Sequence, residues 1–344
     1  MKICHVNLAS GYHGGENQTL QLIKQQIKLG YDLTVVANPK SPFADAVKAL
    51  KCRYVPAKHF LLQHQKSVTQ GCQAIHVHEG RAIYWALIQH WLYGVPYIVT
   101  RRIDNPLKNK WLSNLAYSRA RTLVGLSKEI VSRIQHAFPN KDIHCIPSSP
   151  VRYPSDPVQI KAIRHRFSDA FLVIHAANML GHKGFDVTIE AARHLSTQDN
   201  TVHFALLGDG TIRQDLEKQA SGLSNVSFVG KQSEMGNWFA AADMLVHPSY
   251  SEGLGSVILE ALEAGLPVAA SNAGGIPDII EDNQSGLLIE SGNGEQLAQA
   301  ILQVKNCDTL RTSLLAGAQE KLHTFRIEHT AQRYQALYSA LTRD

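Results

Sequence analysis

The chain has 344 residues, of which 44% are apolar and 18% charged, and its formal net charge is +5. At roughly 150 residues per domain, this length predicts two globular domains. No apolar run approaches the ~20 residues that a membrane-spanning helix requires. Polar residues and glycines interrupt the N-terminal apolar stretch too early for a signal peptide, so we expect a cytoplasmic protein.

Charge is distributed unevenly along the chain. Residues 1–155 contain 20 Lys and Arg against 7 Asp and Glu, a net charge of +13, whereas residues 156–344 contain 14 against 22, a net charge of −8. This asymmetry favours an anionic partner for the first half, with a plain solvated surface as the alternative. Five widely spaced cysteines without a Cys-x-x-Cys pair indicate reduced thiols.

The first half alternates short β-rich apolar runs with helical periodicity, as at Thr19–Leu29 and Ile83–Leu92. Continuous apolar runs indicate strands buried on both faces, hence a parallel sheet. The predicted strands are Ile3–Leu8, Leu33–Ala37, Ala74–Val77, Tyr97–Thr100, Thr122–Leu126 and Ile143–Ile146.

Four prolines in the twelve residues Ile146–Pro157 cannot continue a helix or a central strand, so this segment is predicted to be the interdomain linker. The alternation then restarts, and the tail Asp308–Leu341 is helical. The predicted strands of this half are Phe171–His175, Val202–Leu207, Val226–Val229, Met244–His247, Val268–Ala270 and Leu287–Ile289. We therefore predict an α/β protein of two doubly wound Rossmann-like domains, 1–150 and 151–324, with a C-terminal helix at about 325–344 returning to the first.

Ligands of such sheets bind at the carboxyl ends of the strands, so the cleft between two such halves is the expected site. Gly14 and Gly15 follow the first strand and open a helix, where the backbone can approach a phosphate, although a tight turn explains them equally. Lys183 stands at a helix start, which is unfavourable for a cation unless an anion binds beside it; the alternative is a surface lysine. Gly208 ends another strand, and Asp209 is expected to cap the next helix.

The strongest signal is the segment His247–Ala261, in which a strand leads through a glycine-rich loop into a helix. Glu252 lies in this loop, where its carboxylate can bind sugar hydroxyls. Glu260 lies beside the apolar side of the helix and needs hydrogen-bond donors, which two ribose hydroxyls would supply; exposure to solvent is the alternative. Three loop amides are expected to point into the cleft, those of Gly253, Leu254 and Gly255.

A metal site is not predicted. The sequence contains no Asp-x-Asp metal-binding motif. His76 and His78 would share one face of a strand, so a metal pair is a minor alternative.

Together these residues resemble the family-4 retaining glycosyltransferases, which have the GT-B fold. Seven residues separate Glu252 and Glu260, which is similar to the family's Glu-x7-Glu signature. The segment Ser251–Gly255 resembles its Ser-Glu-Gly-Phe-Gly sequence, with Leu254 in the Phe place. Other matching segments are Gly14–Glu16, Gly208–Gly210, Phe228–Gly230 and Ala273–Asp278.

The resemblance implies transfer of a hexose-type sugar, with retention of configuration and without a metal or other cofactor. The donor would be a nucleotide-diphosphate sugar, UDP being favoured over GDP, and the acceptor a glycan or glycolipid of lipopolysaccharide or surface-polysaccharide synthesis. Glu260 would hold the ribose, Glu252 the donor sugar and Lys183 the diphosphate. Gly15 would contact a phosphate through its backbone, and Lys231 would lie near the base.

The sequence departs from the family pattern at two places. Asn178 stands where the family has an arginine five residues before the lysine, and Thr100–Asn105 replaces a Thr-x-His context. Our hypothesis is that Arg101 or Arg102 supplies positive charge to the diphosphate or to an anionic acceptor. The candidate catalytic residues are Glu252, Lys183 and Arg102, Asn178 is a candidate donor contact, and the candidate acceptor residues are His78, Arg101 and Arg102.

The basic first half is expected to bind the acceptor, and peripheral attachment to the inner face of the cytoplasmic membrane would use the same charge. The basic and aromatic residues expected on this surface are Lys108, Lys110, Arg119, Arg121, Trp85, Trp91 and Trp111. Two alternatives are a non-catalytic nucleotide-sugar-binding protein and a GT-B-fold nucleotide-sugar epimerase. Nucleic-acid binding is not expected, because no recognised motif supports it.

Overall fold

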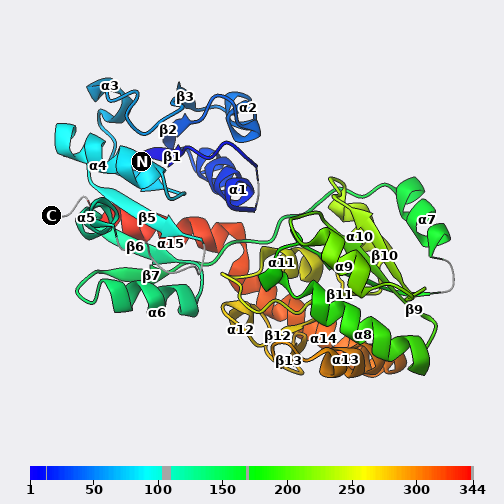
Figure 1. The fold of residues 1–344 in the computed structure, drawn as a ribbon. Coiled ribbons are helices and arrows are strands. Elements are labelled where there is room, and N and C mark those ends of the chain that lie inside the picture. The colour runs from blue at the N-terminus through cyan, green and yellow to red at the C-terminus, as the bar shows by residue number, and fades with distance from the viewer. Residues whose placement is uncertain (13, 103–109, 168–169, 342–344) are drawn as a thin grey trace. The chain divides into compact units, whose positions relative to one another are not determined.

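The computed structural model describes residues 1–12, 14–102, 110–167 and 170–341. The chain divides into two compact units, the first made of Met1–Ser149 and Phe325–Asp344 and the second of Pro150–Thr324. In Figure 1 the first unit runs from blue to teal and includes the red C-terminal helix, and the second runs from green to orange. The boundary falls within the proline-rich segment of the sequence.

The first unit is built on a seven-stranded sheet with the order β3-β2-β1-β4-β5-β6-β7, in which all neighbouring strands are parallel. Its strands are β1 (Lys2–Asn7), β2 (Asp32–Ala37), β3 (Arg53–Pro56), β4 (Ala74–Val77), β5 (Tyr97–Arg101), β6 (Thr122–Gly125) and β7 (Ile143–Cys145). Its helices are α1 (Gly14–Lys28), α2 (Pro42–Lys48), α3 (Lys66–Thr69), α4 (Ala82–Tyr93), α5 (Trp111–Arg119), α6 (Lys128–Ala137) and α15 (Ile327–Ala340).

The C-terminal helix α15 returns to this unit and packs against α1. Four of its side chains are buried in the first unit's core, those of Ala331, Tyr334, Leu337 and Tyr338. They recur at spacings of three or four residues, which places them on one face of the helix. The helix is therefore part of the first unit although it follows the second in sequence.

The second unit has a six-stranded parallel sheet with the order β10-β9-β8-β11-β12-β13. Its strands are β8 (Phe171–Ala176), β9 (Val202–Leu207), β10 (Val226–Gly230), β11 (Met244–His247), β12 (Val268–Ser271) and β13 (Leu287–Ile289). Its helices are α7 (Pro157–Arg166), α8 (Phe185–Gln198), α9 (Arg213–Gln219), α10 (Met235–Ala241), α11 (Ser256–Glu263), α12 (Ile276–Ile279), α13 (Gly294–Asn306) and α14 (Asp308–Leu322), with short 3₁₀ turns at Gly181–Lys183 and His323–Phe325.

Most predicted strands are confirmed to within one or two residues, but the edge strand β3 was missed. Only Val55 of its four residues Arg53–Pro56 is buried, and the strand ends in proline, so it lacks the continuous apolar run of the central strands. None of the described helices is long and apolar enough to cross a membrane.

Each sheet contains one point at which the strand order reverses, between β1 and β4 in the first unit and between β8 and β11 in the second. In doubly wound sheets this switch point opens a crevice at the carboxyl ends of the strands, where ligands bind. The segments that follow these four strands are therefore the ones that can build a site.

Candidate functional site

At the switch point of the second unit, Lys183 follows β8 and Glu252 follows β11. The Nζ of Lys183 donates a hydrogen bond to Oε2 of Glu252 at 2.7 Å, and the two side chains are only 18% and 14% exposed. The alternative of a solvent-exposed Lys183 is therefore wrong. The fold brings together a cation and a carboxylate that lie 69 residues apart in the sequence.

His247, the last residue of β11, completes this cluster. Its Nε2 lies 2.8 Å from the same Oε2 of Glu252, and since a carboxylate oxygen accepts, Nε2 carries the hydrogen. Burial opposes ionisation of Glu252, but the hydrogen bond and charge of His247, together with the charge of Lys183, lower its pKa to about 2. The sequence analysis treated His247 only as a strand end, although its position at the carboxyl end of a central strand could have marked it as a site residue.

Glycines fix the backbone around Glu252. Gly274 has φ +54°, and a Cβ at this residue would lie 2.1 Å from the carbonyl oxygen of Glu252. The N–H of Gly275 donates to that same carbonyl oxygen at 2.8 Å. Gly255, with φ +93°, is the N-cap of α11, so the helix begins where the sequence predicted it. The Glu252 loop is thus clamped between α11 and the segment that follows β12.

Glu260, on α11, is only 8% exposed, so the alternative of a solvent-facing glutamate is wrong. Burial raises its pKa to about 8, and a hydrogen bond with the Tyr153 side chain opposes this rise. The carboxyl group is therefore mostly protonated at pH 7 in the free protein. Ribose hydroxyls that donate hydrogen bonds to it would favour its ionised form. The contribution of Tyr153, which lies in the proline-rich segment, was not foreseen.

The remaining predicted donor residues lie at the ends of neighbouring strands. Gly208, with φ +139°, follows β9, and a Cβ there would lie 1.8 Å from the carbonyl oxygen of Ala177. Asn178, which follows Ala177 in the sequence, and Lys231, which follows β10, are both exposed to solvent. Leu254 is buried, so only its backbone could face a ligand.

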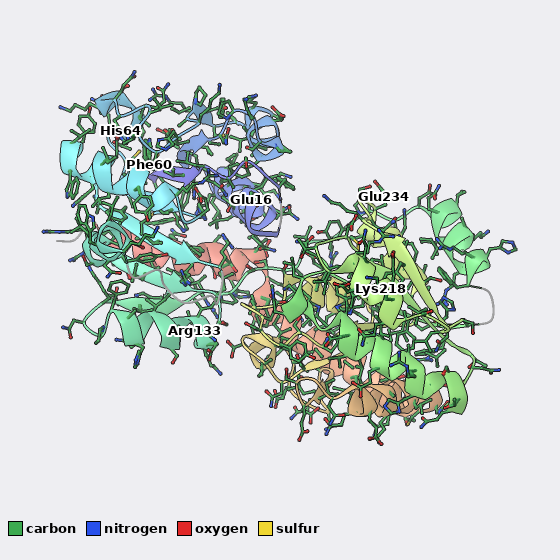
Figure 2. The ribbon with its side chains drawn as sticks, in the orientation of Figure 1. Glu16, Phe60, His64, Arg133, Lys218 and Glu234 are labelled. Atoms are coloured by element: carbon green, nitrogen blue, oxygen red, sulfur yellow. The ribbon has the colours of Figure 1, made fainter. Side chains whose placement is uncertain are left out.

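In the first unit, Gly15 and Arg102 lie against one another. Gly15 is in the first turn of α1, and a Cβ at this residue would lie 3.3 Å from Cδ of Arg102. The guanidinium group of Arg102 reaches Nδ1 of His78 at 3.3 Å and Oγ of Ser148 at 3.4 Å. Its Nε–H is buried and, among the described residues, has no hydrogen-bond partner, a state that an anion would relieve. Glu16, the next residue of α1, is labelled in Figure 2.

The described contact of Arg101 is a different one. Arg101 is the last residue of β5, and its guanidinium lies 3.4 Å from the hydroxyl of Tyr117 on α5. Arg102 is therefore the arginine that the structure places beside the start of α1.

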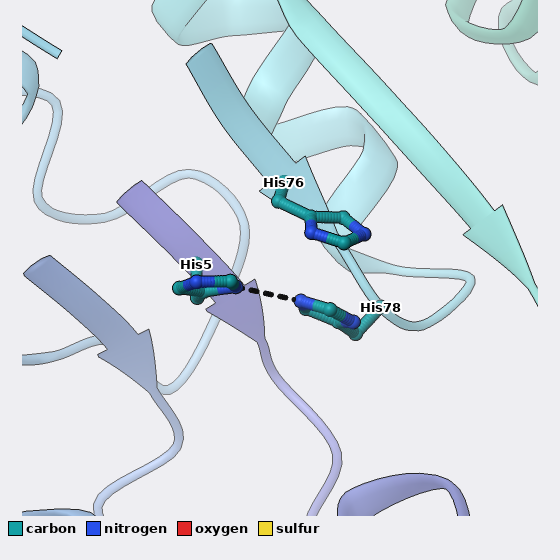
Figure 3. Close-up of side chains that lie close together, drawn as sticks. All are labelled: His5, His76 and His78. Carbon is teal, nitrogen blue, oxygen red and sulfur yellow. Dashed lines mark hydrogen bonds between the residues drawn. The ribbon is translucent and has the colours of Figure 1, made fainter. Parts of the chain in front are cut away.

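Three histidines of the first unit, His5, His76 and His78, gather at the ends of β1 and β4 (Figure 3). Their nearest ring nitrogens all lie within 4.8 Å of one another, which is a spacing that a metal ion could use. Each ring nitrogen, however, already has a hydrogen-bond partner, and one partner of His78 is the Arg102 cation. These contacts favour a hydrogen-bonded network over a metal site.

Two expectations are corrected by the structure, and two others fall wholly or partly outside the described residues. Trp85 is fully buried and its Nε1–H donates to the carbonyl of Leu62, so it adds nothing to the surface. Asp209 does not cap α9, because its carboxylate accepts from the N–H of Gly210 instead. Lys108 is outside the described residues, as are the last three residues of the segment Thr100–Asn105.

The similarity to a known protein family lies within the second unit. Residues 159–321 match the family Glycosyl transferases group 1. An uncharacterised glycosyltransferase of Methanocaldococcus jannaschii is 26% identical over 286 residues, which cover 80% of this chain and 77% of that protein. The lipopolysaccharide core biosynthesis glycosyltransferase LpsD of Rhizobium meliloti is 30% identical over 211 residues, so the match spans 60% of its length.

The structure of HepE from Anabaena in complex with UDP and glucose superposes with a TM-score of 0.81 at 19% identity, over 99% of this chain and 100% of that one. The likeness extends over both units and shows a shared fold. This chain therefore has the GT-B fold, and its residues 159–321 are similar to the Glycosyl transferases group 1 family.

Proposed function

We propose that the protein is a metal-independent, retaining glycosyltransferase. It would transfer a hexose-type sugar from a nucleotide-diphosphate sugar, preferably a UDP-sugar rather than a GDP-sugar, to a glycan or glycolipid of lipopolysaccharide or surface-polysaccharide synthesis. The observation that carries the proposal is the pairing of Glu252 with Lys183 at the switch point of the group 1 domain, with buried Glu260 on the adjoining helix. The likeness to LpsD and to HepE, whose structure contains UDP and glucose, supports the choice of donor and acceptor class.

In this mechanism the second unit binds the donor. The ionised Glu252 accepts hydrogen bonds from hydroxyls of the donor sugar, and Glu260 accepts from the ribose. As the bond to the sugar breaks, negative charge develops on the nucleoside diphosphate, and Lys183 together with the backbone amides at the start of α11 stabilises it. These groups are fixed before the substrate arrives, so little reorganisation is needed in the transition state.

Arg102 is the second cation of the proposal. Asn178 cannot supply the charge that an arginine gives at this place in related enzymes, whereas the Arg102 guanidinium is held beside the start of α1. It would neutralise the diphosphate or an anionic acceptor. The net charge of +13 over residues 1–155 is consistent with an anionic glycolipid acceptor and with peripheral contact to an anionic membrane.

The first test is calorimetric binding of UDP, GDP and ADP in the presence of EDTA, to the native protein and to Glu260→Ala. We expect UDP to bind, and the variant to lose about 1.5–3 kcal/mol, the scale of a hydrogen bond to a charged group. Binding of no nucleotide, or equal binding by the variant, would contradict the proposal. With an acceptor present, the anomeric configuration of the product separates retaining transfer from inversion, and a new sugar nucleotide formed without acceptor would indicate an epimerase.

A further inference from the structure

The buried histidines of the first unit form a hydrogen-bonded chain with a defined direction. Oε1 of Gln26 can only accept, so Nε2 of His5, 2.7 Å away, carries the hydrogen and Nδ1 of His5 is left as an acceptor. Nε2 of His78, 2.8 Å from that Nδ1, must then be the donor. Nδ1 of His78 is left with a lone pair, which accepts from Nη2 of Arg102 at 3.3 Å.

This direction requires neutral rings. Burial lowers the pKa of His5 to about 4 and holds the pKa of His78 well below its ordinary value, and the charge of Arg102 lowers the pKa of His78 further. A protonated His78 would repel Arg102 and would have no lone pair to offer it. The neutral, Nε2-protonated form is therefore the one that can hold the guanidinium group.

The C-terminal helix closes the network from the other side. The side-chain amide of Gln26 donates to the hydroxyl of Tyr338 at 3.3 Å, and this hydroxyl lies 2.6 Å from Nδ1 of His76. Nε2 of His76 contacts Oγ1 of Thr100 at 2.8 Å, which in turn contacts the hydroxyl of Tyr334 at 2.9 Å. Gln26 has its amide nitrogen towards Tyr338 and its oxygen towards His5, and this orientation sets the direction of the chain from His5 to Arg102.

We propose that His78 is a positioning residue: with its tautomer set by His5 and Gln26, it holds the Arg102 guanidinium beside Gly15, ready for the phosphate or other anionic group of the substrate. The inference rests on the role proposed above for Arg102. A free arginine side chain loses many rotamers when it binds an anion, and a guanidinium group that is already held in place loses fewer. The gain appears as tighter anion binding without any contact between His78 and the ligand.

The tautomers are tested by ¹⁵N NMR of the histidine rings in the full-length protein between pH 8 and pH 5.5, with signals assigned through the single variants His5→Gln and His78→Gln. We expect His5 and His78 to remain neutral over this range, with the hydrogen on Nε2 in both. A hydrogen on Nδ1 of His78, or a ring that is protonated at pH 6, would overturn the inference. This measurement does not depend on any substrate.

The positioning role is tested by a double-mutant cycle on nucleotide-sugar kinetics. In His78→Asn the amide oxygen lies near the place of Nδ1 and can still accept from Arg102, whereas in His78→Gln the amide lies near the place of Nε2. We expect His78→Gln to raise KM for the donor about tenfold and His78→Asn to raise it less than threefold, and we expect His78→Gln to have no further effect in an Arg102→Ala background. An equal loss in both backgrounds would show a merely structural role.

Two controls keep this inference separate from the proposed function. Urea unfolding of each variant shows whether it is folded. If the native protein binds none of UDP, GDP or ADP, the proposed function fails, and the same cycle is then run on calorimetric binding of inorganic pyrophosphate. Tight binding that depends on both Arg102 and His78 would support the positioning role, whereas failure to bind pyrophosphate would overturn it.

Discussion

Replacing Glu260 by glutamine tests the burial of this carboxyl group, on which the ribose assignment depends. The pKa of Glu260 is about 8 in the folded protein, against an ordinary value of 4.5. Between these values the native state binds more protons than the unfolded state, so the contribution of this group to stability is complete below pH 4.5 and is lost as the pH rises through 8. At about 1.4 kcal/mol per pH unit, the full difference is about 5 kcal/mol.

We therefore expect the native protein to lose roughly 2–5 kcal/mol of unfolding free energy between pH 5 and pH 8 that Glu260→Gln does not lose. The measurement is urea unfolding at both pH values. The matched control is Glu320→Gln on α14, an exposed glutamate of the same unit, which should follow the native protein. Equal pH dependence of the native protein and Glu260→Gln would refute the reasoning.

The same group links binding to protons. If ribose hydroxyls favour the ionised Glu260, nucleotide binding at pH 7 releases up to about one proton, because the free protein holds it mostly protonated. Calorimetry in buffers with different ionisation enthalpies measures this number. Glu260→Gln should release none, and equal proton release by the two proteins would place the titrating group elsewhere.

Three further outcomes follow from the described geometry. Lys183→Met leaves the buried Glu252 carboxylate without its ammonium partner, so we expect kcat/KM for the donor to fall at least about 100-fold, the scale for losing one charge-stabilising group; a fall of less than threefold would exclude Lys183 from the site. Gly274→Ala forces a Cβ against the Glu252 carbonyl, so activity should fall by more than about tenfold while circular dichroism stays native-like. Arg102→Ala should raise KM for the donor or the acceptor about tenfold and Arg101→Ala should change it little; unchanged kinetics in both would contradict the charge hypothesis.

Much of the fold could be read from local patterns. The central strands are continuous apolar runs because they are buried on both faces, and such runs are visible without any knowledge of their neighbours. The edge strand β3 lacks this signal because half of it is exposed. The Glu252–Glu260 spacing and the glycines around it were equally visible, because they depend on one turn between a strand and a helix.

The chemical state of the site, in contrast, depends on residues that are distant in sequence. Glu252 is ionised because His247, five residues before it, donates to it and because the pairing of β8 with β11 brings Lys183 to it. Glu260 is mostly neutral because the folded chain removes it from water. Desolvation and charge pairing act through space, so the sequence alone determined which groups are present and their spacing within each segment. Only the tertiary structure decided which groups meet, which are charged and, through His5 and His78, how Arg102 is held.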